Sequence, residues 1–267
     1  MGMASTIKKT FASALAGAFL FSSLPFFSVF AKSDEHPREK LAAFSTYFSE
    51  TDKGRCANIA LAAARIDGIA LQPYGEFSFN ACVGERTAEK GYKQAKIIVN
   101  GEYVLGVGGG VCQVSTTLYN LAVLSGLTVT EFHPHSLCVG YVSPSRDAMV
   151  SSASDLKLFN PYAETVYLSV VVSKGAITAT AYGKQDGYKR EMECKELETM
   201  PPPPPEIKYG EKDEIVRYGK DGVKSECYLK TYRNGVLLSV KRLRVDNYLP
   251  TRGIIIKKTE KPTKNLP

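Results

Sequence analysis

The sequence predicts an α+β protein, in which a helix with a cysteine at its N-terminus packs on an antiparallel sheet and a small β module follows. Asn-Gly pairs at 100–101 and 234–235 each join two β-rich runs, which is a strong hairpin signal. Two segments, one ending at Gly68 and one at Gly126, have the apolar periodicity of amphipathic helices. Five consecutive prolines at 201–205 predict a stiff spacer before the C-terminal module.

The N-terminus has the pattern of a secretory signal peptide over residues 1–31. Lys8 and Lys9 precede an uncharged run that ends in Val29-Phe30-Ala31, a small-x-small cleavage site. The run is also long enough for an uncleaved membrane anchor. Both alternatives place the protein outside the cell, in the cell wall or on the outer face of the cytoplasmic membrane.

A polar N-terminal segment, residues 32–43, is expected to contain a short helix in "REKLAAF". The first domain, residues 44–185, begins with the helix that ends at Gly68, and "QPYGEFSFNACVG" then alternates like a strand. "KIIVNGEYVLG" predicts a hairpin, and the glycine-rich stretch 106–110 leads into a helix from about Cys112 to Ser125. Strands are predicted in "LTVTEFHPHSLCVGYV", "AMVSSASDLKLFN" and "TVYLSVVVSKGAITATAYG". In the last of these segments a Lys174-Gly175 turn is expected to join two strands into a hairpin.

Residues 186–205 are expected to form a linker that ends in the prolines. A small basic β module, 206–258, and a tail, 259–267, follow it. The net charge is +7, and residues 206–267 hold 15 Lys and Arg against 8 Asp and Glu, so the excess lies there. An exported basic module suggests anionic wall polymers as partners, and a merely well-solvated surface is an equal alternative. Export and the lack of any recognisable module argue against nucleic acid.

Six cysteines in an exported chain suggest disulfides, with 15 possible pairings. Their spacings are wide and include no Cys-x-x-Cys, which disfavours a structural zinc site. If one cysteine works as a free thiol, at least one more must be unpaired.

Cys112 is the strongest candidate for chemistry. A helix N-terminus lowers the pKa of a thiol, and its free N–H groups can hold a developing oxyanion. Gly108, Gly109 and Gly110 would let a substrate backbone come close. The alternative is a small buried cysteine behind a flexible loop. A phosphate cradle is disfavoured, because no Gly-Lys-Ser/Thr follows.

A reacting thiolate needs a base, and His133 and His135 lie in "TEFHPHSL" after the helix. A cysteine at a helix start, then a histidine, then an orienting carboxylate or amide is the chain order of papain-like and transglutaminase-like sites. The third group could come from Asp147, from Asp155 or from Asn160. A zinc site on Cys112 and both histidines lacks a convincing fourth ligand.

Arg146 is a second kind of candidate. Its guanidinium could bind a substrate carboxylate through two hydrogen bonds. The alternative is a surface turn with a local ion pair to Asp147, which would contribute little.

The quoted motifs resemble the VanW domain of bacterial cell-envelope proteins. "GEFSFN", "VG-RT---GY", "GGG-CQVS-TLYN" and "HPHS" stand in order between about Phe44 and Val172. The C-terminal "GKDG" and "YRNG" are similar to a small wall-associated domain named for its spaced glycines. Two departures stand out: Cys138 occupies a position where proline is common, and Ser145 replaces the usual glycine before Arg146.

The resemblance implies L,D-transpeptidase chemistry on peptidoglycan stem peptides, without a cofactor or a metal. Cys112, in the cysteine position of the family motif, would attack the carbonyl of the third stem-peptide residue. The terminal D-alanine would leave with a proton from a histidine, and an amine of a second stem peptide would resolve the thioester. The expected catalytic residues are Cys112, His133, His135 and Asp147, and the expected substrate-binding residues are Gly108, Gly109, Gly110, Gln113, Ser115 and Arg146.

Three other functions stay open from the sequence. A metal-dependent enzyme would use Cys112, His133 and His135 as ligands. A hydrolase would use water in place of the acceptor amine. A non-catalytic wall-binding or scaffold protein, linked to glycopeptide resistance, would use the basic tail and not need Cys112.

Overall fold

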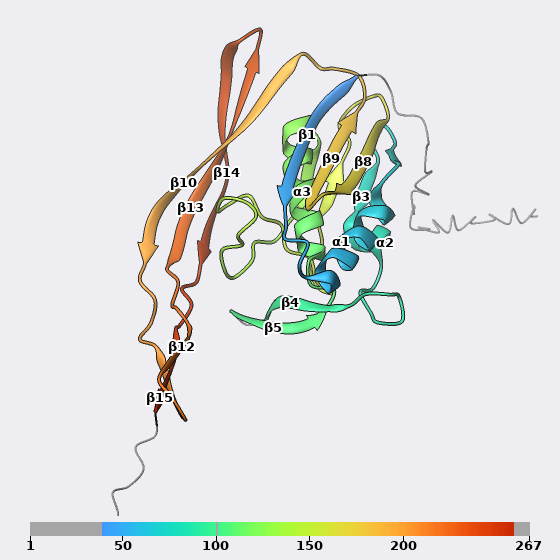
Figure 1. The fold of residues 1–267 in the computed structure, drawn as a ribbon. Helices are drawn as coiled ribbons and strands as arrows, with labels where there is room; N and C mark the ends of the chain where they lie inside the picture. Colours follow the sequence, from blue (N-terminus) through green and yellow to red (C-terminus); the bar gives the residue numbers. More distant parts are fainter. Residues whose placement is uncertain (1–38, 100, 259–267) are drawn as a thin grey trace, which may run out of the picture.

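The computed structural model describes residues 39–99 and 101–258, and its main sheet has four antiparallel strands (Figure 1). The order is β1 (Lys40–Tyr47), β9 (Ala176–Tyr182), β8 (Val166–Ser173) and β2 (Ile69–Leu71). Lys174 and Gly175 join β8 to β9 with φ of 50° and 71°, as a tight hairpin turn requires. The predicted hairpin over 165–182 is therefore confirmed.

The short helix expected in "REKLAAF" is wrong, because Lys40–Tyr47 form strand β1. It pairs along its length with β9, from Lys40 opposite Tyr182 to Tyr47 opposite Ala176. The helix propensity of Lys-Leu-Ala-Ala is a few tenths of a kcal/mol per residue, and a complete strand ladder overrides it. The predicted signal peptide and most of the polar segment lie outside the described residues.

Two helices pack on this sheet and on each other: α1 (Lys53–Ile66) and α3 (Val111–Ser125). The Asp52 side chain caps α1 by accepting from the Arg55 N–H at 3.0 Å. Gly126, with φ of 81°, closes α3 as predicted. Nearly all of α3 is buried, including Leu118 and Leu121, so this helix forms the centre of the core.

Smaller elements surround the start of α3. A short helix, α2 (Phe79–Val83), follows β3 (Glu76–Ser78), which belongs to a sheet with β7 (Lys157–Phe159) and β6 (Thr128–Glu131). The predicted hairpin is confirmed as β4 (Gln94–Val99) and β5 (Glu102–Val107). The long strands expected on both sides of "HPHS" are wrong: they shrink to β6 and β7, and residues 132–156 between them form a loop without strand or helix.

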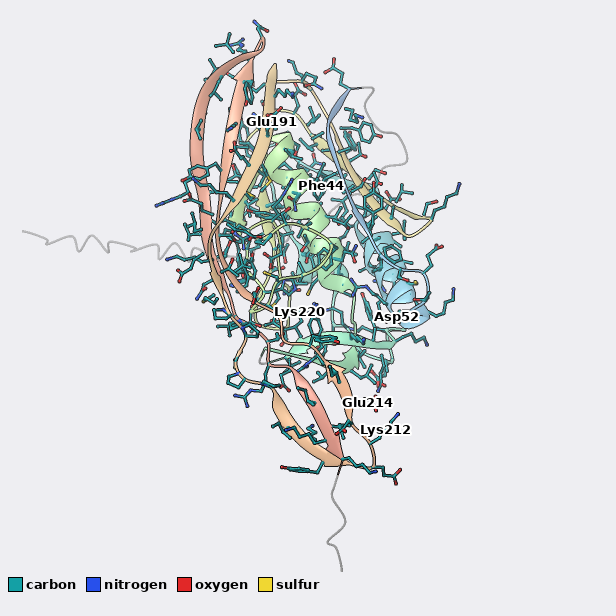
Figure 2. All side chains as sticks on the ribbon, turned by 60° about the vertical axis from the view of Figure 1, so that its left-hand side comes forward. Phe44, Asp52, Glu191, Lys212, Glu214 and Lys220 are labelled. Carbon is teal, nitrogen blue, oxygen red and sulfur yellow. A yellow bond between two sulfur atoms is a disulfide. The ribbon has the colours of Figure 1, made fainter. Side chains whose placement is uncertain are left out.

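The C-terminal part forms two three-stranded sheets. The larger is antiparallel, in the order β10 (Tyr188–Met200), β13 (Gly222–Arg233) and β14 (Val236–Tyr248). In the smaller, β15 (Ile254–Lys258) pairs parallel with β11 (Glu206–Gly210) and antiparallel with β12 (Glu214–Arg217). Figure 2 shows Lys212 and Glu214 of the smaller sheet at the end of the molecule away from Phe44 on β1.

The linker expected over 186–205 is not one. Its greater part is strand β10, which a disulfide between Cys194 and Cys227 fastens to β13. The prolines therefore connect two strands of the C-terminal part and do not separate it from the first domain. The fold is mixed, with mostly antiparallel strands, and within residues 39–99 and 101–258 no helix is long and apolar enough to cross a membrane.

Candidate functional site

A cavity of about 830 Å³ lies at the start of α3. Its walls come from the segment after α2, the β4–β5 hairpin, the first turn of α3 and the loop 132–156. The lining residues include Arg86, Tyr103, Gly109, Cys112 and His135. Two of the sequence-predicted catalytic residues thus meet at one cavity.

The glycines before Cys112 are needed by the backbone itself. Gly108 and Gly110 have φ of 88° and 107°, conformations that L side chains rarely adopt. A Cβ on Gly109 would lie 2.6 Å from the Lys96 carbonyl oxygen. The glycines therefore let α3 start close against α1 and β4, and they also line the cavity.

Cys112 is the second residue of α3 and is half-buried. Its sulfur accepts a hydrogen bond from the Val150 N–H at 3.5 Å and lies 3.4 Å from the Val150 carbonyl oxygen. His135 is the neighbour that most strongly lowers the pKa of this thiol, through hydrogen bonding and through its charge. The thiol is therefore held in place and still borders the cavity.

His135 and Asp147 complete a chain of three groups. The His135 Nδ1 lies 2.6 Å from the Asp147 Oδ2, which also accepts the His135 backbone N–H at 2.7 Å. Because Nδ1 is hydrogen-bonded to the carboxylate, Nε2 is the ring nitrogen that is left to exchange a proton with Cys112. Both His135 and Asp147 are buried. A carboxylate in this position fixes the tautomer and orientation of an imidazole.

The charges of this chain favour a thiolate and an imidazolium. Burial acts to raise the pKa of Cys112, but the His135 hydrogen bond and charge, the Val150 N–H and the Arg86 charge together lower it below its ordinary value. Burial acts to lower the pKa of His135, but Asp147 and Cys112 raise it to about 9. Burial likewise opposes ionisation of Asp147, yet its hydrogen bond and ion pair with His135 hold its pKa below the usual range.

His133 does not join this chain. Its Nε2 lies 3.1 Å from Glu131, whose other oxygen pairs with Lys157 at 2.7 Å. Strand β6 ends at Glu131, so neither histidine lies on a strand and strand alternation does not place them on one face. Of the two candidate bases, the structure brings only His135 to Cys112.

Arg146 lies away from the cavity, contrary to the expectation of a substrate-binding role there. Its Nε donates to the Asn120 side chain at 2.8 Å, and its guanidinium stacks 4.8 Å from the centre of the Phe44 ring. Burial lowers its pKa. Arg146 therefore joins α3 to β1, and the local ion pair with Asp147 that was the alternative is not formed either, because Asp147 turns to His135.

Gln113 and Ser115 are buried and positioned by protein groups. The Gln113 amide donates to the Tyr47 carbonyl at 2.9 Å, and the Ser115 hydroxyl donates to the Ala148 carbonyl at 2.6 Å. Gln113 borders the cavity, whereas Ser115 faces the loop behind it. Ser115 therefore holds the loop on α3, and its expected role in binding substrate is not supported by its position.

The other two candidates for the third group have structural roles. Asp155 accepts hydrogen bonds from Ser78 and from the Asn80 N–H, at the start of α2. Asn160 donates to the Leu71 carbonyl at 3.0 Å and so ties two chain segments together. Neither borders the cavity. Within the described part of the chain, no group of three or more metal-ligating side chains converges, and His133 is turned away from Cys112.

Three cationic side chains also line the cavity, and none of them was predicted from the sequence. Arg55, Arg86 and Lys96 line it, and Glu85 is the single acidic residue among its lining. The Arg55 Nη2 donates to Gln113 at 2.6 Å, and the Arg86 Nη1 donates to Asn80 at 2.8 Å. These partners are neutral, so both guanidinium groups keep their charge available to a ligand.

Arg86 could have been predicted from the sequence as a functional residue, because it lies in the "VG-RT" motif. Its neighbourhood, however, is assembled from α2, the first turn of α3 and the loop 132–156, which are far apart in sequence. Tyr141 is a similar case: it lines the cavity, and burial next to the Cys112 charge raises its pKa well above the ordinary value.

The fold and site thus define an α+β domain with a Cys-His-Asp chain at a cationic cavity. Residues 54–182 match the family model described as "VanW like protein". The central part of the chain is therefore a VanW-like domain.

Two curated proteins are similar to this chain. An uncharacterized protein, YoaR of Bacillus subtilis, is 42% identical over 145 residues, which are 54% of this chain and 48% of that protein. The vancomycin B-type resistance protein VanW of Enterococcus faecalis is 31% identical over 78 residues, 29% of this chain and 28% of that protein. The chain spans about half the length, or less, of these relatives.

Two solved structures match part of the chain. The G5 domain of IgA1 protease is 20% identical with a TM-score of 0.20, and it covers 28% of this chain and 92% of its own. The HP0197-G5 crystal structure is 20% identical with a TM-score of 0.16, and it covers 26% of this chain and 96% of its own. These TM-scores lie below the level that shows a common fold.

Proposed function

We propose that this protein is a cell-envelope cysteine acyltransferase of the L,D-transpeptidase type, acting on peptidoglycan stem peptides. The observation that carries the proposal is the chain from Cys112 through His135 to Asp147, which ends at a cavity large enough for a peptide. One relative's name connects it with vancomycin resistance, which suits a function in the cell wall.

The reaction follows from the positions of these groups. The Cys112 thiolate attacks a peptide carbonyl carbon. The Val111 and Gln113 N–H groups already donate to the Gly108 and Gly110 carbonyls, so the Cys112 N–H is the first-turn donor that stabilises the developing oxyanion. The carbon–nitrogen bond breaks, and the His135 Nε2–H protonates the leaving amine. The acceptor amine then attacks the thioester and gives its proton to neutral His135, and the Cys112 thiolate is released.

The cations of the cavity favour a substrate with a free carboxylate. A guanidinium with neutral partners binds a carboxylate through its remaining N–H groups, and such charge-assisted hydrogen bonds are stronger than neutral ones. The terminal residue of a stem peptide carries its carboxylate two bonds from the scissile nitrogen. Arg86, whose charge acts on Cys112, is best placed to hold it there.

Mass spectrometry of the intact protein tests the proposal. The purified protein is mixed with a disaccharide tetrapeptide, and we expect an acyl adduct on Cys112 and, with an acceptor peptide, a cross-link between two third residues. Cys112→Ala should remove both, whereas Cys138→Ala should keep both. If wild type yields neither an adduct nor a cross-link while an established transpeptidase does so in parallel, acyl transfer is wrong.

A second measurement addresses the carboxylate. The same peptide with its terminal carboxylate amidated should react more slowly in wild type. Arg86→Gln should slow the free acid by about 10- to 100-fold, since one hydrogen bond to a charged group contributes about 1.5–3 kcal/mol. It should slow the amidated peptide much less, because that peptide loses only the effect of the Arg86 charge on the Cys112 pKa. Equal effects on both peptides would show that Arg86 does not read the carboxylate.

A non-catalytic wall-binding role is the second candidate. The basic excess in residues 206–267 favours it. It predicts that Cys112→Ala leaves the cellular function intact, and the adduct experiment separates the two.

A further inference from the structure

We propose that the larger C-terminal sheet is required for the geometry of the catalytic site, because Tyr248 and Arg244 on β14 position Asp147. This inference rests on the proposed function for the role of His135. The contact spans a sequence separation of 101 residues between Asp147 and Tyr248. Figure 1 shows the loop 132–156 lying between α3 and the strands β13 and β14.

The two oxygens of Asp147 are divided between two parts of the chain. Oδ2 faces His135, whereas Oδ1 accepts the Tyr248 hydroxyl at 2.5 Å and lies 3.6 Å from the Arg244 Nη2. The Tyr248 oxygen in turn accepts the Ser145 N–H at 2.8 Å. With Oδ1 held, the carboxylate plane cannot rotate freely, so Oδ2 stays directed at the His135 ring.

Arg244 holds the backbone of the same residue. Its Nη1 donates to the Asp147 carbonyl at 2.6 Å, and two further nitrogens form a bidentate pair with Asp246 at 2.6 and 3.0 Å. The guanidinium lies over the rings of Phe132, at 4.5 Å, and Tyr119, at 5.5 Å. The Arg244 side chain is only 3% exposed. Its charge is paired with Asp246 on the same strand, and its remaining nitrogen contacts the loop.

Two more contacts fasten the loop to the C-terminal strands. The Ser145 and Ser225 hydroxyls lie 2.7 Å apart, and the Leu249 N–H donates to the Ser136 carbonyl at 2.8 Å. On its other side the loop is held by α3, through Ser115 and the Ala148 carbonyl. The loop that carries His135 and Asp147 is therefore clamped between the two domains, and the site is incomplete without the C-terminal sheet.

The Tyr248 hydroxyl stays protonated, and so remains a hydrogen-bond donor, throughout the pH range of the experiments below. Burial, and then the Asp147 charge, raise its pKa well above the ordinary value, so its proton stays on the oxygen. Its hydroxyl and the Arg244 charge are among the causes that keep the Asp147 pKa low. Tyr248 and Arg244 are positioning residues, since neither lines the cavity.

Tyr248→Phe in the full chain tests this inference. We expect the rate of Cys112 alkylation by iodoacetamide at neutral pH to fall about three- to tenfold, with the acid limb of its pH profile moved upward. The downfield NMR signal of the His135 Nδ1 proton should shift. With peptide substrate, kcat should fall while KM stays the same, because the cavity is untouched. Tyr228→Phe, the same chemical change on β13 away from Asp147, is the matched control.

Thermal unfolding shows whether Tyr248→Phe is folded. A folded variant with the alkylation profile, the proton signal and kcat of wild type would overturn the inference. If Tyr248→Phe does not fold, Arg244→Lys takes its place, because it keeps the charge and loses the bidentate geometry. An unchanged profile in that variant has the same meaning.

The two proposals fail separately. If no peptide adduct forms but the Cys112 profile depends on Tyr248, positioning of Asp147 stands and acyl transfer is wrong. If wild type forms cross-links and Tyr248→Phe forms them at the same kcat, acyl transfer stands and the role of the C-terminal sheet is wrong.

Discussion

Removing the imidazole beside Cys112 gives the sharpest test of the site. In the folded protein His135 is the main group that opposes the burial of the thiol, through its hydrogen bond and its charge. An opposite charge at this range lowers a pKa by about 1–3 units. His135→Gln should therefore raise the Cys112 pKa, because a neutral amide leaves the burial unopposed.

The effect on the alkylation rate is smaller than the change in thiolate fraction. A thiolate of higher pKa is intrinsically more nucleophilic, with a Brønsted coefficient of about 0.4–0.5. Below both pKa values the rate therefore falls by roughly 3- to 50-fold for a shift of 1–3 units. Above the pKa of the variant thiol both proteins are fully ionised, and the variant should react roughly 3- to 30-fold faster, because its thiolate is the more nucleophilic.

The assay is the pH dependence of iodoacetamide labelling, read at Cys112 by peptide mass spectrometry. Burial, together with the charges of Asp147 and Glu196, raises the pKa of Cys138 to about 11, so this thiol is an internal slow reference. His133→Gln is the matched control, since His133 pairs with Glu131 and not with the thiol. Coincident profiles for wild type, His135→Gln and His133→Gln would refute the imidazolium–thiolate pair.

Three further predictions concern stability. The folded pKa of His135, about 9, lies above its ordinary 6.5, so its protonation stabilises the fold fully below about pH 6.5, and this contribution is lost as pH rises through 9. The free energy of unfolding in urea should therefore fall across this pH window in wild type, and this pH dependence should be absent in His135→Gln. Replacing Cys194 and Cys227 by serine should cost about 3–4 kcal/mol, because the bridge closes a separation of 33 residues, and unchanged urea unfolding would contradict this. Ser225→Ala should cost about 1–3 kcal/mol by leaving the buried Ser145 hydroxyl unpaired, and much less in a Ser145→Gly background, as a double-mutant cycle would show.

Ser145 also explains a detail that the sequence presents without a reason. It replaces the usual glycine of the family motif, and its φ of 62° is in the left-handed region that favours glycine. A serine there costs about 1 kcal/mol relative to glycine. Its hydroxyl bond to Ser225 offsets this cost, and Ser225 belongs to the C-terminal sheet. The departure is therefore matched to the partner domain, which sequence motifs of the first domain alone do not reveal.

Local patterns predicted the parts of the fold that depend on short-range rules. The Asn-Gly and Lys-Gly turns, the helix closed by Gly126 and the position of Cys112 in the first turn all follow from neighbouring residues. The strand at Lys40–Tyr47 and the strand in place of the linker depend on pairing with partners more than 20 residues away. No local propensity contains that information.

The candidate site likewise has features that the sequence predicts and features that depend on long-range contacts. Chain order predicted a cysteine, a histidine and a later carboxylate, and Cys112, His135 and Asp147 are close together. The choice of His135 over His133 required the loop geometry that Pro134 introduces. Arg146 was expected to bind substrate because its guanidinium could pair with a carboxylate, but in the irregular loop it lies against Asn120 and Phe44. The cationic residues that do line the cavity, Arg55, Arg86 and Lys96, come from other segments.

The position of β14 changes how the wall-binding hypothesis must be tested. Deleting the C-terminal part would remove Tyr248 and Arg244 from Asp147, so a loss of function would not separate wall retention from catalysis. The smaller sheet offers a cleaner perturbation. Lys208, Lys257 and Lys258 are exposed on β11 and β15, away from the cavity lining.

Changing these three lysines to glutamine should weaken binding to isolated cell walls if anionic polymers are the partner. The binding of wild type should fall with added salt, because exposed charges are screened within about 10 Å at moderate ionic strength. Cys112 alkylation should stay at the wild-type rate, since no contact links these side chains to Asp147. Wall binding that persists at the wild-type level in the triple variant would show that the basic excess is a solvated surface. The contacts with the loop that carries His135 and Asp147 would then be the role that is left for the C-terminal part.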